Sequence, residues 1–311
     1  MAEFNSISID RRDYRSNSLW RLTLRRILRQ RNAVIGFVIL GFLLLVALFA
    51  PLLAPYAPNQ VLIGIEDVKK REAPCIHILG CPADQPQHIM GIDGNVRDEF
   101  SRVIYGTQVS LFIGFITIGF AIIIGSLLGA IAGYYGGAVD NIIMRILDVL
   151  MAFPSLLLAI AIVAVLGPGL QNALLAIGIV SIPIYARVVR GSVLSVKECA
   201  YVSASRAMGA SNFHILFNRI LPNVLAPLIV QGTLGIGTAI LDAAALSFLG
   251  LGAQPPMAEW GTMLGLERNQ VFTAPHLVFF PGIAIMITVL AFNLMGDGLR
   301  DAIDPRLSQN Q

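Results

Sequence analysis

Five long stretches of this chain carry no Asp, Glu, Lys or Arg, and they alternate with segments rich in charged and polar residues. They cover residues 33–65, 103–139, 149–186, 220–241 and 269–296. A charge at the centre of a bilayer costs roughly 2.5–3.5 kcal/mol on insertion scales, so charge-free stretches of this length predict helices that span a membrane. The pattern therefore favours an all-α membrane protein.

Turn-forming residues divide these stretches into six helices. Pro51 and Pro55 end the first helix, and Gly167-Pro168-Gly169 splits the third stretch into two helices of roughly 20 residues, the length that crosses a bilayer. The fifth helix continues past Asp242. The predicted transmembrane helices thus cover residues 33–54, 109–132, two parts of 149–186, 220–248 and 276–296.

The basic residues indicate how these helices lie across the membrane. With the amino terminus inside, sixteen of the 22 Lys and Arg residues are cytoplasmic and six are external, so the positive-inside rule favours an N-in, C-in topology. Eight of them lie in residues 1–32 among leucines, which predicts an interfacial helix on anionic lipid. The helix at 33–54 starts too late for a cleaved signal peptide and is expected to be a permanent anchor.

Composition agrees with a membrane protein, since 56% of the residues are hydrophobic and only 13% are charged. A soluble domain of 311 residues would not stay in solution with that balance. The net charge of +3 comes from the amino-terminal end, so it does not indicate a nucleic-acid partner.

The predicted external loop, residues 55–105, is much longer than a simple connector, so we expect it to be folded or to form a contact surface. Cys75 and Cys81 lie in it and could close a small disulfide loop outside the cytoplasm. A metal site with His77 and His88 is the alternative, but without a CxxC pair we expect surface residues instead.

The chain has no motif for chemistry of its own. It contains no G-x-x-x-x-G-K-[ST] phosphate loop, no H-E-x-x-H and no G-x-S-x-G, so we expect neither an enzyme nor a bound cofactor. Energy for transport would come from an ion gradient or from a partner protein. An ion-coupled carrier usually needs ionisable groups buried in its spans, and this chain offers few.

Two acidic residues lie in or beside the predicted spans. Asp148 is three residues after Arg145 and is expected to pair with it locally. Asp242 differs, because at about 100° per residue Gln231, Thr238 and Asp242 fall on one face of a helix. We expect this face to border a pore or a partner subunit. The alternative is that Asp242 is hydrated at the external boundary.

The predicted cytoplasmic loop at residues 187–222 is far longer than two helices need to turn around. Good helix formers on either side of Gly209 predict two short helices that meet at a bend, and Arg206 and Arg219 could pair with an acidic groove. Taken alone, the pattern fits a docking segment for a partner protein and an amphipathic helix on the lipid surface equally well.

The spacing around Gly209 resembles the cytoplasmic loop of ATP-binding-cassette (ABC) importer permeases, which has Glu-Ala-Ala, three residues, Gly and then a Leu-Pro pair. Here Ser203-Ala204-Ser205 precedes Gly209, and the Leu-Pro pair ends thirteen positions after that glycine. Ser203 replaces the acid, so we expect the contact to depend on shape and on the arginines. The resemblance assigns ATPase docking to Ser203, Ala204, Ser205, Arg206, Ala207, Gly209, Ala210, Leu221 and Pro222.

Other stretches along nearly the whole chain resemble the second permease subunit of the oligopeptide/dipeptide type. Among them are GYYGGAVDNIIMRILDVLMAFPSLLLAI, ALSFLGLGAQPPMAEWGTML and DGLRDAIDPRL. In HIMGIDGNVRDEF the family more often has Gly-Thr-Asp-x-x-Gly-Arg-Asp, so Ile92 and Val96 depart from its pattern.

The resemblance implies a subunit of the inner cell membrane, with a permease core at residues 106–297 and a cytoplasmic tail at 298–311. The implied partners are a second, homologous permease, two ABC ATPases that hold ATP and magnesium, and a solute-binding protein. That protein would contact the long external loop and the later one around Trp260. The expected cargo-path residues are Gln231, Thr238, Asp242 and Asn293.

The cargo implied by this resemblance is a di- or oligopeptide, although relatives of the family carry nickel, glutathione or oligosaccharides. Two other classes fit parts of the pattern. One is a stand-alone, gradient-driven carrier or channel, which a stable association with an ATPase would distinguish from an importer. The other is a membrane-embedded enzyme, for which the chain lacks a nucleophile or metal constellation.

Overall fold

The structure is a computed structural model that describes residue 28 and residues 30–303. The predicted interfacial helix, apart from its last few residues, and the end of the predicted tail lie outside this range. The elements are α2 (Arg31–Leu48), α3 (Ala50–Leu53), η1 (His77–Leu79), α4 (Glu99–Tyr135), α5 (Gly137–Met151), α6 (Ser155–Leu166), α7 (Leu170–Val196), α8 (Ala200–Ala207), α9 (Asn212–His214), the π-helix η2 (Ile215–Ile220), α10 (Leu221–Phe248), α11 (Trp260–Glu267), η3 (Arg268–Gln270) and α12 (His276–Ile303).

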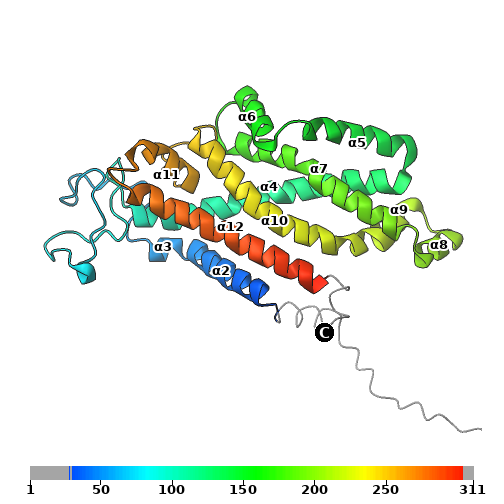
Figure 1. The fold of residues 1–311 in the computed structure, drawn as a ribbon, viewed down its shortest axis with the longest axis horizontal. Coiled ribbons are helices and arrows are strands. Elements are labelled where there is room, and N and C mark those ends of the chain that lie inside the picture. Colours follow the sequence, from blue (N-terminus) through cyan, green and yellow to red (C-terminus); the bar gives the residue numbers. More distant parts are fainter. Residues whose placement is uncertain (1–27, 29, 304–311) are drawn as a thin grey trace, which may run out of the picture.

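The long helices lie side by side in an elongated bundle, with the external loop and α11 at one end and α8 and α9 at the other (Figure 1). Five of the described helical segments are long and apolar enough to cross a membrane, namely α2, α4, α7, α12 and α10 with the turns before it. The bent pair α5 and α6 would make a sixth. The predicted all-α membrane fold is confirmed.

The third predicted span differs from expectation, because α5 and α6 meet at an angle of 90°. With 12 residues, α6 rises about 18 Å, less than the roughly 30 Å of a bilayer core. Pro154 between the two helices disfavours helical geometry at Phe153. Two straight helices of about 20 residues within 149–186 were therefore the wrong expectation. The second helix, α7, does begin after the predicted turn.

Two helix boundaries also move. The predicted loop end at 105 and helix start at 109 are too late, because the side chain of Asp98 caps α4 by accepting a hydrogen bond from the Ser101 amide at 2.8 Å. Arg102, which the charge criterion placed outside the helix, is buried within it. At its far end α7 continues to Val196, so the first part of the predicted 187–222 loop is helical.

Small residues set the closest helix contacts. Gly129 of α4 faces the carbonyl of Ala186 on α7 so closely that a methyl group there would clash. On the other side of the bundle, Gly298 of α12 lies against Ala33 of α2, and Gly36 lies against the α12 backbone. Such contacts let helices approach closely in a membrane, where van der Waals packing drives their association.

Ion pairs attach α5 to α7. Both carboxylate oxygens of Asp140 accept from Arg190, with nitrogen–oxygen distances of 2.5 and 2.6 Å. Asp148 pairs with Arg187 at 2.5 Å. The expected local pair of Asp148 with Arg145 is therefore wrong, because this face of α5 lies against α7.

Candidate functional site

The segment from residue 197 to residue 222, which we call the α8–α9 segment, projects at the end of the bundle opposite the external loop (Figure 1). Gly209 lies between its two helices with φ of +82°. A Cβ atom there would meet nothing within 4 Å, so glycine supplies a left-handed backbone conformation rather than space. The Ala210 amide donates to the Ser205 carbonyl at 3.1 Å and closes α8.

Most residues assigned to docking are on the outer side of this segment. Ser203, Ala204, Arg206, Ala207, Gly209 and Pro222 are exposed, and Ala210 is half-buried. Ser205 is buried instead, and its hydroxyl donates to the carbonyl of Tyr201 at 2.9 Å. Leu221 is half-buried and packs against the main hydrophobic core. These two side chains stabilise the segment and do not form its outer surface.

Two exposed apolar side chains in the α8–α9 segment were missed by the sequence reasoning. Met208 is 77% exposed and Phe213 is 72% exposed. The Phe213 ring stacks on Phe217, with ring centroids 4.4 Å apart. The available signal was the occurrence of two large apolar residues within four positions of Gly209, among small and polar residues.

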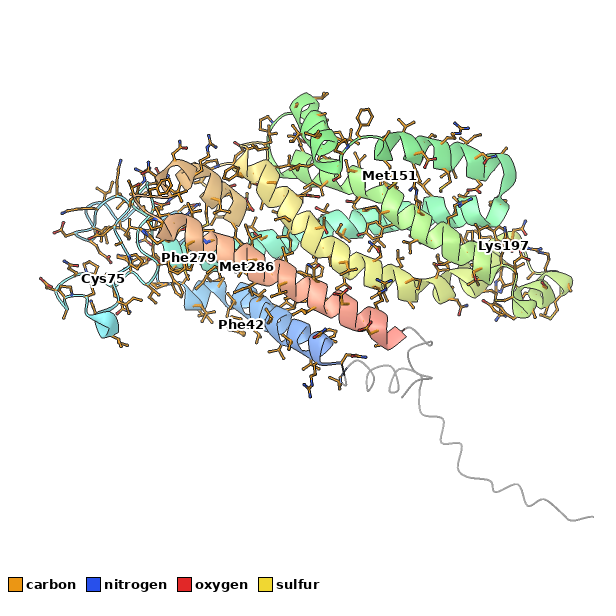
Figure 2. The ribbon with its side chains drawn as sticks, viewed as in Figure 1. Phe42, Cys75, Met151, Lys197, Phe279 and Met286 are labelled. Carbon is orange, nitrogen blue, oxygen red and sulfur yellow. A yellow bond between two sulfur atoms is a disulfide. The ribbon has the colours of Figure 1, made fainter. Side chains whose placement is uncertain are left out.

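Hydrogen bonds fix this segment to the helices around it. Lys197 Nζ donates to the Gly133 carbonyl at 3.1 Å, and the Tyr134 hydroxyl donates to Asn212 Oδ1 at 2.8 Å, so the beginning and the middle of the segment are tied to the end of α4. Lys197 is visible at this end of the bundle in Figure 2. Asn223 of α10 donates to the Arg219 carbonyl at 2.7 Å. The segment is therefore held in a defined orientation.

The four residues assigned to a cargo path lie on α10 and α12. Thr238 and Asn293 are exposed, whereas Gln231 and Asp242 are half-buried. Asn293 of α12 lies beside Gly237 of α10, which puts it near the level of Thr238. Because α10 is continuous from Leu221 to Phe248, the shared face of its three polar residues is preserved.

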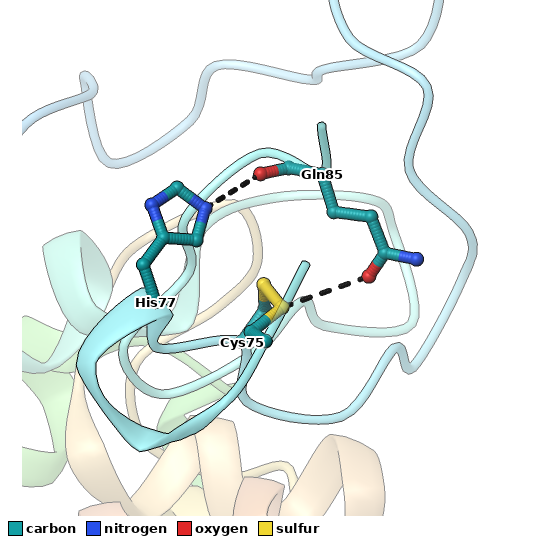
Figure 3. The surroundings of a disulfide bond; sticks show 4 residues. Cys75, His77 and Gln85 are labelled. Carbon is teal, nitrogen blue, oxygen red and sulfur yellow. Dashed lines mark hydrogen bonds between the residues drawn. A yellow bond between two sulfur atoms is a disulfide. The ribbon is translucent and has the colours of Figure 1, made fainter. Parts of the chain in front are cut away.

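The external loop is folded around a disulfide bond. Cys75 and Cys81 are joined, with their Cα atoms 5.4 Å apart. His77 donates from Nε2 to the carbonyl of Gln85 at 2.8 Å across the same small loop (Figure 3). The Cys75 amide donates to the His88 carbonyl at 2.9 Å. The described residues contain no cluster of three or more His, Cys, Asp or Glu side chains suited to a metal ion.

A buried histidine connects this loop to α4. The Nδ1 and Nε2 atoms of His88 lie 2.8 Å from Asp98 and 3.0 Å from Glu66, and Glu66 also accepts from the Tyr56 hydroxyl at 2.6 Å. Burial of the ring lowers the pKa of His88, but the hydrogen bonds and negative charges of Asp98 and Glu66 outweigh it, so the pKa is raised. Burial of the Tyr56 hydroxyl, together with its hydrogen bond to Glu66, likewise raises the pKa of Tyr56.

A second group of buried polar contacts joins the two external loops. Arg102 donates to the carbonyls of Pro58 at 2.8 Å and Pro256 at 3.3 Å.

In the later loop, Glu259 caps α11 by accepting hydrogen bonds from the amides of the next turn, and burial raises the pKa of its carboxyl despite those bonds. Trp260 itself is fully buried in the loop that carries it. Further along the same loop, Phe272 is almost fully exposed.

The bundle has a helical segment projecting at one end and a folded loop at the other (Figure 1). It superposes on inward-facing structures of the MetNI methionine ABC transporter. One such structure gives a TM-score of 0.52 at 21% identity, over 66% of this chain and 98% of the other. At that identity the likeness concerns the fold alone.

Sequence comparison identifies the family. Residues 125–309 match the model for binding-protein-dependent transport system inner membrane components, and residues 18–74 match the N-terminal transmembrane domain of oligopeptide transport permease C. This chain belongs to that family of inner-membrane permease subunits, as its resemblance to ABC importer permeases predicted.

Curated relatives align over most of their own length. The dipeptide transport system permease protein DppC of Alkalihalophilus pseudofirmus is 49% identical, over 94% of this chain and 92% of the relative. The glutathione transport system permease protein GsiD of Pectobacterium atrosepticum is 45% identical, over 95% and 94%. The di/tripeptide permease DppC of Pseudomonas aeruginosa is 46% identical, over 89% of each chain.

Proposed function

We propose that this permease passes di- or oligopeptides across the inner membrane as one of two homologous permease subunits. An external solute-binding protein delivers the cargo, and two cytoplasmic ABC ATPases supply the energy and hold ATP and magnesium. The cargo class is supported by the relatives, whose names refer to dipeptides, di/tripeptides and glutathione, all of them short peptides.

The observation that carries the proposal is the exposed α8–α9 segment with its left-handed glycine. Small residues on the outer side of α8 let a groove on the ATPase approach closely, while Met208 and Phe213 supply apolar anchors. Arg206 and Arg219 are both exposed and can pair with acidic groups of the groove. With Ser203 at the position of the family's acid, the contact depends on shape and on these cations.

The bonds that hold the segment explain how the motor would act on the spans. A displacement of the α8–α9 segment is passed to α4 through Lys197 and Tyr134, and to α10 through Asn223. ATP-driven closure of the motor would thereby tilt these helices between two states. Cargo would pass along the face with Gln231, Thr238 and Asp242, next to Asn293 of α12.

The external surface is the side we assign to the solute-binding protein. The disulfide loop presents Ile78, which is 94% exposed, and the later loop presents Phe272. The contacts of Arg102 hold the two loops together, so both can serve one partner. The N-in topology puts these loops outside and the α8–α9 segment inside.

Copurification with the ATPase tests the docking assignment. Gly209→Val should abolish copurification, because a β-branched residue resists φ of +82°. Gly209→Asn is the matched control, since asparagine tolerates this region, and it should keep most of the association. If both variants retain the ATPase, the α8–α9 segment is not the docking site.

Transport by the reconstituted complex in vesicles tests the energy source and the cargo. Uptake of a labelled dipeptide should require ATP on the side of the ATPase and the presence of the solute-binding protein. Uptake driven by an ion gradient without ATP would contradict the importer mechanism. A complex that hydrolyses ATP in response to the binding protein but moves no peptide would contradict the cargo class alone.

A further inference from the structure

An apolar cavity of about 440 Å³ lies between the amino-terminal anchor and the permease core. Its walls come from α2, α3, α4, α11 and α12, at the end of the bundle that carries the external loop (Figure 1). The main lining side chains are Phe42, Leu53, Phe100, Trp260, Phe280 and Ala284.

The cavity offers no free hydrogen-bonding side chain among its lining residues. Only Thr107 and Trp260 carry polar atoms there, and both donate to the carbonyl of Val103, at 3.3 and 3.0 Å. A buried water needs two to four polar partners, so water is a poor occupant of this space. An apolar ligand suits it better.

The cavity is continuous with the surface that faces lipid. Phe42 is 64% exposed and lines the cavity from α2, and Leu53 is 48% exposed and lines it from the end of α3. Phe42 and the exposed Met286 belong to the two spanning helices, α2 and α12, that border the cavity (Figure 2). The opening therefore meets bilayer hydrocarbon.

We infer that this cavity binds one acyl chain of an outer-leaflet phospholipid. The lining is apolar, its two polar side chains are already hydrogen-bonded and its opening meets hydrocarbon, which together fit an acyl chain. The disulfide loop at the same end marks the outer side of the membrane. The bound chain would complete the packing between the anchor and the core.

Native mass spectrometry of the complete transporter, purified with its lipids, tests this site. Ala284→Phe fills the cavity and should lower the count of retained phospholipids by one per permease. Leu290→Phe on the same helix, at an exposed position outside the cavity, is the matched control and should keep the wild-type count. Val46→Phe fills the cavity from α2 and should reproduce the loss if Ala284→Phe fails to fold.

Two results would overturn the inference. One is an unchanged phospholipid count in both cavity-filling variants. The other is an efficient cross-link from Ile283→Cys to the second permease, because it would show a partner side chain in the cavity. Restricted motion of an acyl-chain spin label on phosphatidylcholine, lost in Ala284→Phe, would support it. None of these readouts involves transport, so their failure leaves the proposed function untouched.

Discussion

The Nδ1 atom of His88 lies 2.8 Å from Oδ1 of Asp98, which ties a buried ring of the external loop to the residue that caps α4. The imidazolium form can donate to Asp98 and Glu66 together, whereas the neutral ring can donate to only one of them. Protonation of His88 therefore stabilises the folded loop.

This arrangement predicts a pH-dependent loop. The pKa of His88 is raised in the folded loop. Its contribution to the stability of the loop is therefore fully present below the unfolded pKa of about 6.5, and it is lost as the pH rises through the folded-state pKa. Protease cleavage of the loop in proteoliposomes should accelerate over that window. His88→Gln should remove the dependence, and His77→Gln, at an exposed ring, should preserve it. Equal pH profiles for His88→Gln and wild type would refute the assignment.

The close contact of Gly129 with Ala186 predicts a sharp difference between two glycines of α4. Gly129→Ala should lower the free energy of unfolding by about 1–3 kcal/mol, because the added methyl group forces α4 and α7 apart. Gly119→Ala meets nothing within 4 Å and should change it by less than about 1 kcal/mol. Thermal unfolding of the purified complex measures both. Similar losses at the two positions would contradict the packing argument.

Val96 is buried, yet its φ is +59°, a conformation that β-branched residues rarely adopt. Val96→Ala and Val96→Gly both remove its contacts with Leu62 and Ile92. Only glycine also removes the backbone strain, so Val96→Gly should be more stable than Val96→Ala by about 1 kcal/mol. Chemical unfolding measures the free energy of unfolding of the two variants. If Val96→Ala proves more stable than Val96→Gly, the prediction is wrong.

The two ion pairs between α5 and α7 should differ in strength. Asp140–Arg190 has two hydrogen bonds and a carboxylate that is 14% exposed, whereas both side chains of Asp148–Arg187 are about half exposed. Double-mutant cycles with Asp→Asn and Arg→Gln should give a coupling above about 1 kcal/mol for the first pair and below it for the second. Equal couplings would mean that burial and bidentate geometry do not set the strength here.

Much of the fold follows from where charges are absent. That criterion located the apolar parts of α2, α7, α10 and α12, because a charge-free stretch of about 20 residues favours a membrane-spanning helix. It failed for α5 and α6, since a charge-free stretch says nothing about a bend at Pro154. It also failed at Arg102, where a buried network satisfies a charge inside a helix.

The candidate site was predictable to a different degree. Gly209 between two runs of helix formers predicted the bend between two short helices, because glycine readily takes the left-handed conformation that ends a helix. The inward side chain of Ser205 was not predictable, since it depends on the tertiary position of α8. The sequence shows that Val96 departs from the glycine of the family's pattern. Only the structure shows that Val96 has a left-handed backbone conformation.

One helix, α4, touches both ends of the molecule. Asp98 and His88 fasten its first turn to the disulfide-bonded loop, and Tyr134 in its last turn holds Asn212 in the α8–α9 segment. Its 37 residues make a rod about 55 Å long. A single continuous helix thus joins the disulfide-bonded loop to the α8–α9 segment, so a displacement at one attachment has a direct route to the other.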